Sequence, residues 1–254
     1  MYEPLVLITR PKIDADNIAE EINKLGAKTL IAPMLKIEFC SARAIDFSNC
    51  QGILFTSSNG ARALSKGLEK NHFAYSLPVF AVGNTTGRVA NECGFFDIKT
   101  AAGDVESLIK CVSKHSSPHH GKLIHIAGSN VAGDLVGKLG NLSFNVKTEI
   151  LYSADQTSEL NQETIEVINN GSLEYAIFFS PRTTKTFNNL ISAAKYKRSM
   201  IKMEAICLSE AVAYEARALP WHRVTVSIKP TQDALLSILA ERIAERREKN
   251  KRYE

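Results

Sequence analysis

Small polar residues follow several short apolar runs along the chain, and these residues are the first candidates for chemistry. Each cluster stands where a strand-like run gives way to a helix-like segment. A helix N-terminus offers backbone N–H groups and partial positive charge, and Ser, Thr or Asn adds neutral side-chain donors. The clusters occupy residues 9–11, 56–60, 83–86, 128–130, 180–183, 209–210 and 229–231. The set predicts a cleft that binds oxyanions without a metal.

Any one of these clusters, taken alone, is more often a helix cap than a ligand site, since Ser, Thr and Asn favour the N-cap position. The prediction therefore rests on their repetition. The sequence contains no G-x-x-x-x-G-K-[ST] phosphate loop and no G-x-S-x-G elbow, and residues 82–87 (VGNTTG) lack the glycine spacing of a dinucleotide-binding turn. These absences argue against P-loop proteins, dinucleotide-dependent enzymes and α/β-hydrolases.

The histidines and cysteines do not predict a metal site. His119 and His120 lie in a polar segment with no third ligand at a suitable spacing, which favours a surface loop. His125 lies in a strand, where a core or edge histidine with its hydrogen bonds satisfied is the favoured interpretation and a cleft-facing one the alternative. The five cysteines form no C-x-x-C pair, which favours reduced thiols over disulfides or zinc.

Tyr152 is a further candidate, because it follows the run Glu-Ile-Leu at residues 149–151, where the chain is expected to cross between lobes. Its hydroxyl either points into a cleft or belongs to an amphipathic residue at a lobe interface, and the sequence leaves both readings open.

Strand and helix patterns alternate along the whole chain, which predicts an α/β fold with parallel sheets. Gly26 and Gly94 follow helical patterns, where glycine readily adopts the left-handed conformation that ends a helix. A helix is expected over 131–139 and a strand over 223–228. The chain carries about ten strand-like runs, which suggests two lobes with a sheet each.

The lobe boundary is expected at two extended segments, 33–39 and 147–153, because neither leads into a polar turn and a helix. A single cut near 122–126 is the alternative. The preferred division assigns residues 1–33 and 154–254 to lobe 1, residues 40–148 to an inserted lobe 2, and residues 34–39 and 149–153 to the connectors.

The composition is that of an ordinary globular protein, with 254 residues, 44% hydrophobic residues and a net charge of +4. Apolar runs are strand-sized and the N-terminus lacks a signal-peptide pattern, so we expect a cytoplasmic protein without a membrane partner. The basic residues of 241–254 suit a solvated helix end better than a nucleic-acid-binding arm.

Six segments and one tyrosine, taken in order, resemble the uroporphyrinogen-III synthase family over nearly the full length. Their order and spacing carry the resemblance, since each is short. It implies two flavodoxin-like lobes, one inserted in the other and joined by a two-stranded connector. The matching elements are residues 7–11 (LITRP), 54–63 (LFTSSNGARA), 80–90 (FAVGNTTGRVA), Tyr152, 178–187 (FFSPRTTKTF), 205–213 (AICLSEAVA) and 229–236 (KPTQDALL).

The resemblance implies a lyase of porphyrin and haem biosynthesis. Its substrate would be hydroxymethylbilane, a linear tetrapyrrole with acetate and propionate arms. The product would be uroporphyrinogen III, formed with loss of water and inversion of ring D, and no metal or organic cofactor is implied. We expect a monomer that makes at most transient contact with hydroxymethylbilane synthase. The alternatives are a non-catalytic two-lobed protein that binds an anionic metabolite and, less favoured, a sugar-phosphate or nucleotide enzyme.

The same resemblance assigns roles to individual residues. Tyr152 would hydrogen-bond the leaving hydroxyl of the substrate, and Thr86 matches a threonine of the cleft. The residues expected to bind substrate carboxylates are Arg10, Ser57, Ser58, Asn59, Gly83, Asn84, Gly128, Ser129, Ser180, Arg182 and Ser209.

One segment departs from the family pattern. Many relatives have Arg-Gly after the fourth strand of the inserted lobe and a second arginine at the start of the following helix. Here those positions read Ala127-Gly128 and Gly133-Asp134. The carboxylate contacts of this segment are therefore either missing or made by the backbone alone.

Overall fold

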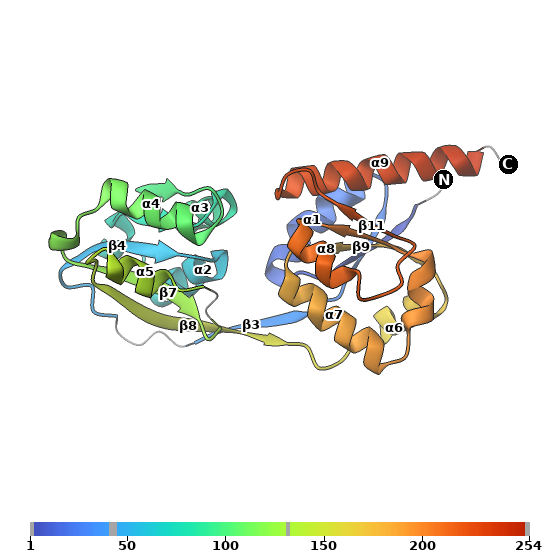
Figure 1. The fold of residues 1–254 in the computed structure, drawn as a ribbon, viewed down its shortest axis with the longest axis horizontal. Coiled ribbons are helices and arrows are strands. Elements are labelled where there is room, and N and C mark those ends of the chain that lie inside the picture. Colours follow the sequence, from blue (N-terminus) through green and yellow to red (C-terminus); the bar gives the residue numbers. More distant parts are fainter. Residues whose placement is uncertain (1–2, 41–44, 131–132, 252–254) are drawn as a thin grey trace. The chain divides into compact units, whose positions relative to one another are not determined.

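The computed structural model describes residues 3–40, 45–130 and 133–251, and the chain folds into two compact units (Figure 1). One unit comprises Met1–Lys36 and Gln156–Glu254, and the other comprises Ile37–Asp155. Both boundaries fall within neighbouring strands, β3 (Leu35–Phe39) and β8 (Val146–Gln156).

The first unit is built on a five-stranded parallel sheet with the order β11-β10-β9-β1-β2. This is the 2-1-3-4-5 order of flavodoxin-like doubly wound sheets. Its strands are β1 (Leu5–Ile8), β2 (Lys28–Ile31), β9 (Leu173–Phe178), β10 (Glu204–Cys207) and β11 (Arg223–Val226).

Helices cover both faces of this sheet, because its strands are apolar on both sides. Val6 and Ile8 pack with α1 (Lys12–Lys24) and α9 (Gln232–Lys251), the long red helix of Figure 1. Leu7 faces the opposite cluster. The helices on that second face are α6 (Gln162–Asn169), α7 (Pro181–Ala193) and α8 (Glu210–Ala216), accompanied by a 3-10 turn at Lys197–Lys202.

The second unit has a six-stranded sheet with the order β3-β8-β7-β4-β5-β6, in which β4 to β8 pair in parallel. The parallel strands follow the other common doubly wound order, 3-2-1-4-5. They are β4 (Cys50–Phe55), β5 (Val79–Ala81), β6 (Ile98–Thr100), β7 (Lys122–Gly128) and β8.

Each face of the second sheet also carries a pair of helices. One pair is α2 (Ser58–Gly67) and α3 (Asn84–Glu92), and the other is α4 (Val105–His115) and α5 (Leu135–Asn141). Two 3-10 turns, Phe73–Ser76 and Pro118–His120, complete the unit. No helix in the described part of the chain is long and apolar enough to cross a lipid bilayer.

The predicted α/β class with parallel sheets in two lobes is confirmed, and so are two helix ends. Gly26 and Gly94 follow α1 and α3 with φ of +75° and +100°. The helix expected over 131–139 was placed too early, since α5 begins at Leu135 after Gly133 with φ of +76°. Residues 131–132 lie outside the described ranges. The strand expected over 223–228 ends at Val226.

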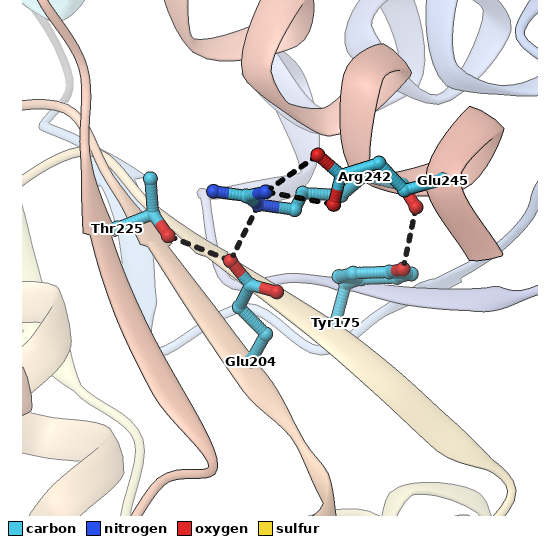
Figure 2. Close-up of polar contacts among 5 residues, drawn as sticks. All are labelled: Tyr175, Glu204, Thr225, Arg242 and Glu245. Atoms are coloured by element: carbon cyan, nitrogen blue, oxygen red, sulfur yellow. Dashed lines mark hydrogen bonds and ion pairs between the residues drawn. The ribbon is translucent and has the colours of Figure 1, made fainter.

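A partly buried polar network joins α9 to the first sheet (Figure 2). Glu204, which is 7% exposed, accepts hydrogen bonds from Thr225 Oγ1 at 2.6 Å and from Arg242 Nε at 3.1 Å. Arg242 also pairs with Glu245, and the hydroxyl of Tyr175 donates to the Arg242 carbonyl at 3.3 Å. The network therefore ties one helix to three neighbouring strands.

We expect Arg242→Met to lower the free energy of unfolding of this unit by about 3 kcal/mol, because it leaves the Glu204 carboxylate buried without its charged partner. Urea unfolding followed by the fluorescence of Trp221, which packs in the same unit, measures the change. The control is Arg217→Met, which removes an exposed pair with Glu210 and should leave the midpoint unchanged. Equal losses in both variants would contradict the prediction.

Candidate functional site

Each sheet has one point at which its strand order reverses, between β1 and β9 in the first unit and between β4 and β7 in the second. Ligands of doubly wound sheets bind beyond the carboxyl ends of the strands at such points. The turns that follow these four strands contain most of the residues expected to bind substrate. They are Arg10, Ser57, Ser58, Asn59, Ser129, Ser180 and Arg182, with Gly128 closing β7 itself.

Arg10, in the turn after β1, is held by its own unit. Its Nη1 donates to Gln232 Oε1 at 3.1 Å, and its Nη2 lies 3.6 Å from Asp14 Oδ2. The guanidinium also lies 4.5 Å from the centre of the Phe179 ring. A ligand carboxylate would therefore compete with Asp14 for this arginine.

The other two turns of the first unit differ in how they use their serines. Ser180 caps α7, since its Oγ accepts from Thr183 N at 3.2 Å and lies 2.5 Å from Thr183 Oγ1. Ser209 precedes α8 without making a side-chain cap. Its partly exposed hydroxyl is therefore open to a ligand, whereas that of Ser180 already has partners. Arg182 lies partly exposed in the first turn of α7.

The turn after β4 is shaped by helix capping. Ser57 Oγ accepts from Asn59 N at 3.2 Å, and Asn59 Oδ1 accepts from Arg62 Nη1 at 3.1 Å. Ser58, the first residue of α2, is partly exposed. A Cβ at Gly60 would lie 3.0 Å from the Ile126 carbonyl oxygen, so glycine lets α2 begin close to β7. Ser58 is thus the serine of this turn with no capping role.

The turn after β5 exposes Asn84 but not Thr86. Gly83 is the N-cap of α3 and Asn84 its first residue. Thr86, two positions further on, is only 6% exposed. The polar side chain that this turn presents to solvent next to Gly83 is therefore that of Asn84, and the predicted cleft threonine lies mostly within the unit.

Tyr152 lies on β8 directly opposite Gly128 of β7, after a bulge between Ala127 and Gly128. A Cβ at position 128 would lie 2.6 Å from Tyr152 Cε2, so the close approach of the ring requires a glycine. Ser129 N donates to the Tyr152 carbonyl at 2.9 Å. The side chain is 8% exposed, and its hydroxyl makes no hydrogen bond to any described residue. The hydroxyl can therefore hydrogen-bond a ligand without breaking a contact to a described residue.

The segment that departs from the family pattern, residues 127–134, contains a carboxylate of its own, that of Asp134. Asp134 is the N-cap of α5, and its Oδ1 accepts from Gly137 N at 2.9 Å. The positive end of α5 is therefore already paired with a carboxylate, and a ligand carboxylate would meet like charge there. Ser129 and Asn130 are exposed beside it.

A pair of contacts across the two switch points was not anticipated from the sequence. Thr9 Oγ1 donates to the Ile177 carbonyl at 2.9 Å, and Thr56 Oγ1 lies 3.1 Å from His125 Nε2. Each threonine directly follows the first parallel strand of its unit. The sequence does show that the two threonines occupy equivalent positions, because each ends an apolar run, in residues 7–9 and 54–56.

His125 lies in the core, as the favoured interpretation held, but it is not fully satisfied as expected, because its buried Nδ1 has no hydrogen-bond partner among the described residues. It is 0% exposed, and burial lowers its pKa below the ordinary value of 6.5. Within residues 3–40, 45–130 and 133–251, no three His, Cys, Asp or Glu side chains are grouped so that they could hold a metal ion.

Comparison with known proteins agrees with this architecture. Residues 16–237 match the model of the family described as uroporphyrinogen-III synthase HemD. The chain is 24% identical to a porphyrin biosynthesis protein HemD of Ruminiclostridium josui over 95% of its own length and 50% of the relative, so it spans about half of that protein. It is 25% identical to a uroporphyrinogen-III synthase of Chlorobaculum parvum, covering 83% of this chain and 88% of the relative.

Two solved structures share the fold. One is uroporphyrinogen-III synthetase from Helicobacter pylori, with a TM-score of 0.61 at 18% identity, covering 94% of this chain and 99% of the other. The second is a mutant uroporphyrinogen III synthase from Thermus thermophilus, with a TM-score of 0.55 at 15% identity, covering 95% and 99%. Because the family model matches most of the residues that form both units, the chain belongs to the uroporphyrinogen-III synthase HemD family.

Proposed function

We propose that this chain is a cyclising hydro-lyase that converts hydroxymethylbilane into uroporphyrinogen III, with inversion of ring D and loss of water. Membership of the HemD family supports the assignment to tetrapyrrole synthesis. The observation that carries the proposal is Tyr152, a buried tyrosine whose hydroxyl makes no hydrogen bond within the described residues. It lies in the strand beside the switch-point strand β7.

In the proposed reaction the Tyr152 hydroxyl donates a hydrogen bond to the terminal hydroxyl of the bilane. Electrons from the ring A pyrrole nitrogen move toward the methylene carbon as the C–O bond breaks. The departing hydroxyl takes a proton from Tyr152 and leaves as water, and the proton lost from the pyrrole N–H restores Tyr152. The substituted carbon of ring D attacks the azafulvene methylene and forms a spirocyclic intermediate. The bond between that carbon and the methylene bridge to ring C then breaks, which leaves an azafulvene on ring C. The unsubstituted α-carbon of ring D attacks this bridge carbon and loses its proton to the ring C nitrogen, which closes the inverted ring. Metal and organic cofactors have no part in these steps.

The substrate carries eight carboxylates on a flexible chain, so it has to be folded before the ends can join. Side-chain donors for these carboxylates include Ser58, Asn84, Arg182 and Ser209, each at least partly exposed beyond the carboxyl end of a strand. Holding the reacting ends together can contribute about 7–11 kcal/mol in favourable cases. We propose that the enzyme acts as a monomer with at most transient contact with the synthase that supplies the bilane.

The test is incubation of the purified chain with hydroxymethylbilane, followed by oxidation and chromatographic separation of isomers I and III. The bilane closes unaided to isomer I, so accumulation of isomer III demonstrates the activity. Isomer I alone in the presence of protein would reject it. Saturable binding of the bilane without isomer III would instead favour a binding protein for an anionic metabolite.

A further inference from the structure

The two switch-point threonines use their hydroxyl groups differently. Thr9 is 0% exposed, and its hydroxyl donates its hydrogen to the Ile177 carbonyl, which can only accept. Thr56 is partly exposed, and its partner is a ring nitrogen of His125, which can either donate or accept. The direction of the hydrogen bond therefore decides what Thr56 offers to a ligand.

Strand register explains why these two side chains meet. Leu54 of β4 pairs with His125 of β7, and Thr56 lies two residues beyond Leu54. Side chains two residues apart on a strand share a face, so Thr56 and His125 lie on the side of the sheet occupied by the Leu54 cluster. Thr56 stands at the carboxyl edge of that side, and His125 stands behind it in the core.

His125 is neutral at physiological pH, because its side chain is completely buried and its lowered pKa has no compensating charge. The Nδ1 atom is buried and has no hydrogen-bond partner. A proton on Nδ1 would leave a buried donor unpaired, and orphaned buried N–H groups are rarer than unpaired acceptors. The proton therefore resides on Nε2, which donates to Thr56 Oγ1.

We infer that His125 is a positioning residue that converts Thr56 into a hydrogen-bond donor for a substrate carboxylate. With Oγ1 accepting from Nε2, the hydroxyl hydrogen of Thr56 is left to point away from His125, toward the partly exposed carboxyl edge of β4 at the switch point. The identity of the ligand, a carboxylated tetrapyrrole, rests on the proposed function. The hydrogen-bond direction rests only on burial and contacts.

The test is a double-mutant cycle with wild type, Thr56→Val, His125→Leu and the double variant. KM and kcat are measured with hydroxymethylbilane, and binding of uroporphyrin III is measured separately by fluorescence. We expect Thr56→Val to raise KM about tenfold with little change in kcat, since one donor to a charged group is lost. His125→Leu should raise KM about threefold in the wild-type background and not at all in the Thr56→Val background.

Two further measurements separate positioning from structural damage. Leucine at 125 replaces a buried, half-paired ring by an apolar group, so the thermal midpoint should stay the same or rise while KM rises. His125→Gln, which retains an amide donor, should restore part of the affinity. An unchanged KM in Thr56→Val, or an equal effect of His125→Leu in both backgrounds, would overturn the inference.

The measurement of uroporphyrin III binding tests this inference separately from the proposed function. If the wild-type chain binds uroporphyrin III but makes no isomer III, the proposed function is rejected. The same double-mutant cycle, measured as affinity for uroporphyrin III, then decides the role of His125. Absence of uroporphyrin III binding to the wild-type chain overturns the inference, because Thr56 would then have no polycarboxylate ligand.

Discussion

Tyr152→Phe is expected to lower kcat for isomer III formation by about 10²-fold, because a positioned proton donor typically contributes 10²- to 10⁴-fold. The hydroxyl makes no hydrogen bond to the described residues, so its removal breaks none among them. The ring remains, and with it the packing against Gly128. The variant should therefore unfold at the same temperature as the wild type and bind uroporphyrin III with similar affinity.

A second buried tyrosine supplies the control. Tyr175 is 1% exposed, and its hydroxyl donates to the Arg242 carbonyl in the network that holds α9. Tyr175→Phe should thus lower stability and leave kcat unchanged, the reverse of Tyr152→Phe. Steady-state kinetics and thermal unfolding on both variants make the comparison. Wild-type turnover in Tyr152→Phe would remove this tyrosine from the mechanism.

Gly128→Ala is expected to lower kcat by a comparable factor without touching the hydroxyl. The added Cβ would lie 2.6 Å from Cε2 and 2.8 Å from Cζ of Tyr152, so the ring has to move. A displacement of about 1 Å in a reacting group can cost about 10²-fold in rate. Tyr152 packs in the hydrophobic core of its unit, so this overpacking should also lower stability by about 1–3 kcal/mol.

The matched control is Gly140→Ala in α5 of the same unit. A Cβ at position 140 meets no atom within 4 Å, so it should raise stability by about 1 kcal/mol through helix propensity and leave kcat unchanged. In the double variant Gly128→Ala/Tyr152→Phe, the two losses should not add, because both act through one hydroxyl. Additive losses would show that Gly128 acts by another route.

The α/β class and the position of most turns could be predicted from the sequence, because they depend on local physics. One example is the sequence of β1, the polar residues 9–11 and α1, which follow one another directly along the chain. Gly26 and Gly94 end their helices through their own backbone conformation. Such features need no knowledge of distant residues. The early start expected for α5 failed because the apolar pattern of the segment concealed the break that Gly133 and Asp134 impose.

The candidate site required the tertiary structure, because the same residue types serve capping and ligand binding alike. Ser180 and Ser209 look equivalent in the sequence, yet only Ser180 has its hydroxyl engaged as a cap. Arg10 looked like a ligand for carboxylates, and it is held by Gln232, 222 residues away. Whether a polar side chain caps a helix, binds a distant residue or can bind a ligand depends on contacts that the chain makes across the sheet.

The sequence by itself determined that polar turns end the strands of an α/β protein and that their order resembles one family. Only the tertiary structure decided which of these groups meet. Thr56 and His125 are 69 residues apart, and Tyr152 reaches Gly128 only through the register of β7 with β8. Parallel strands are joined by long crossovers, so their pairing depends on the packing of whole units rather than on local propensity. That pairing brings the Thr56 hydroxyl to His125 and the Tyr152 ring to Gly128.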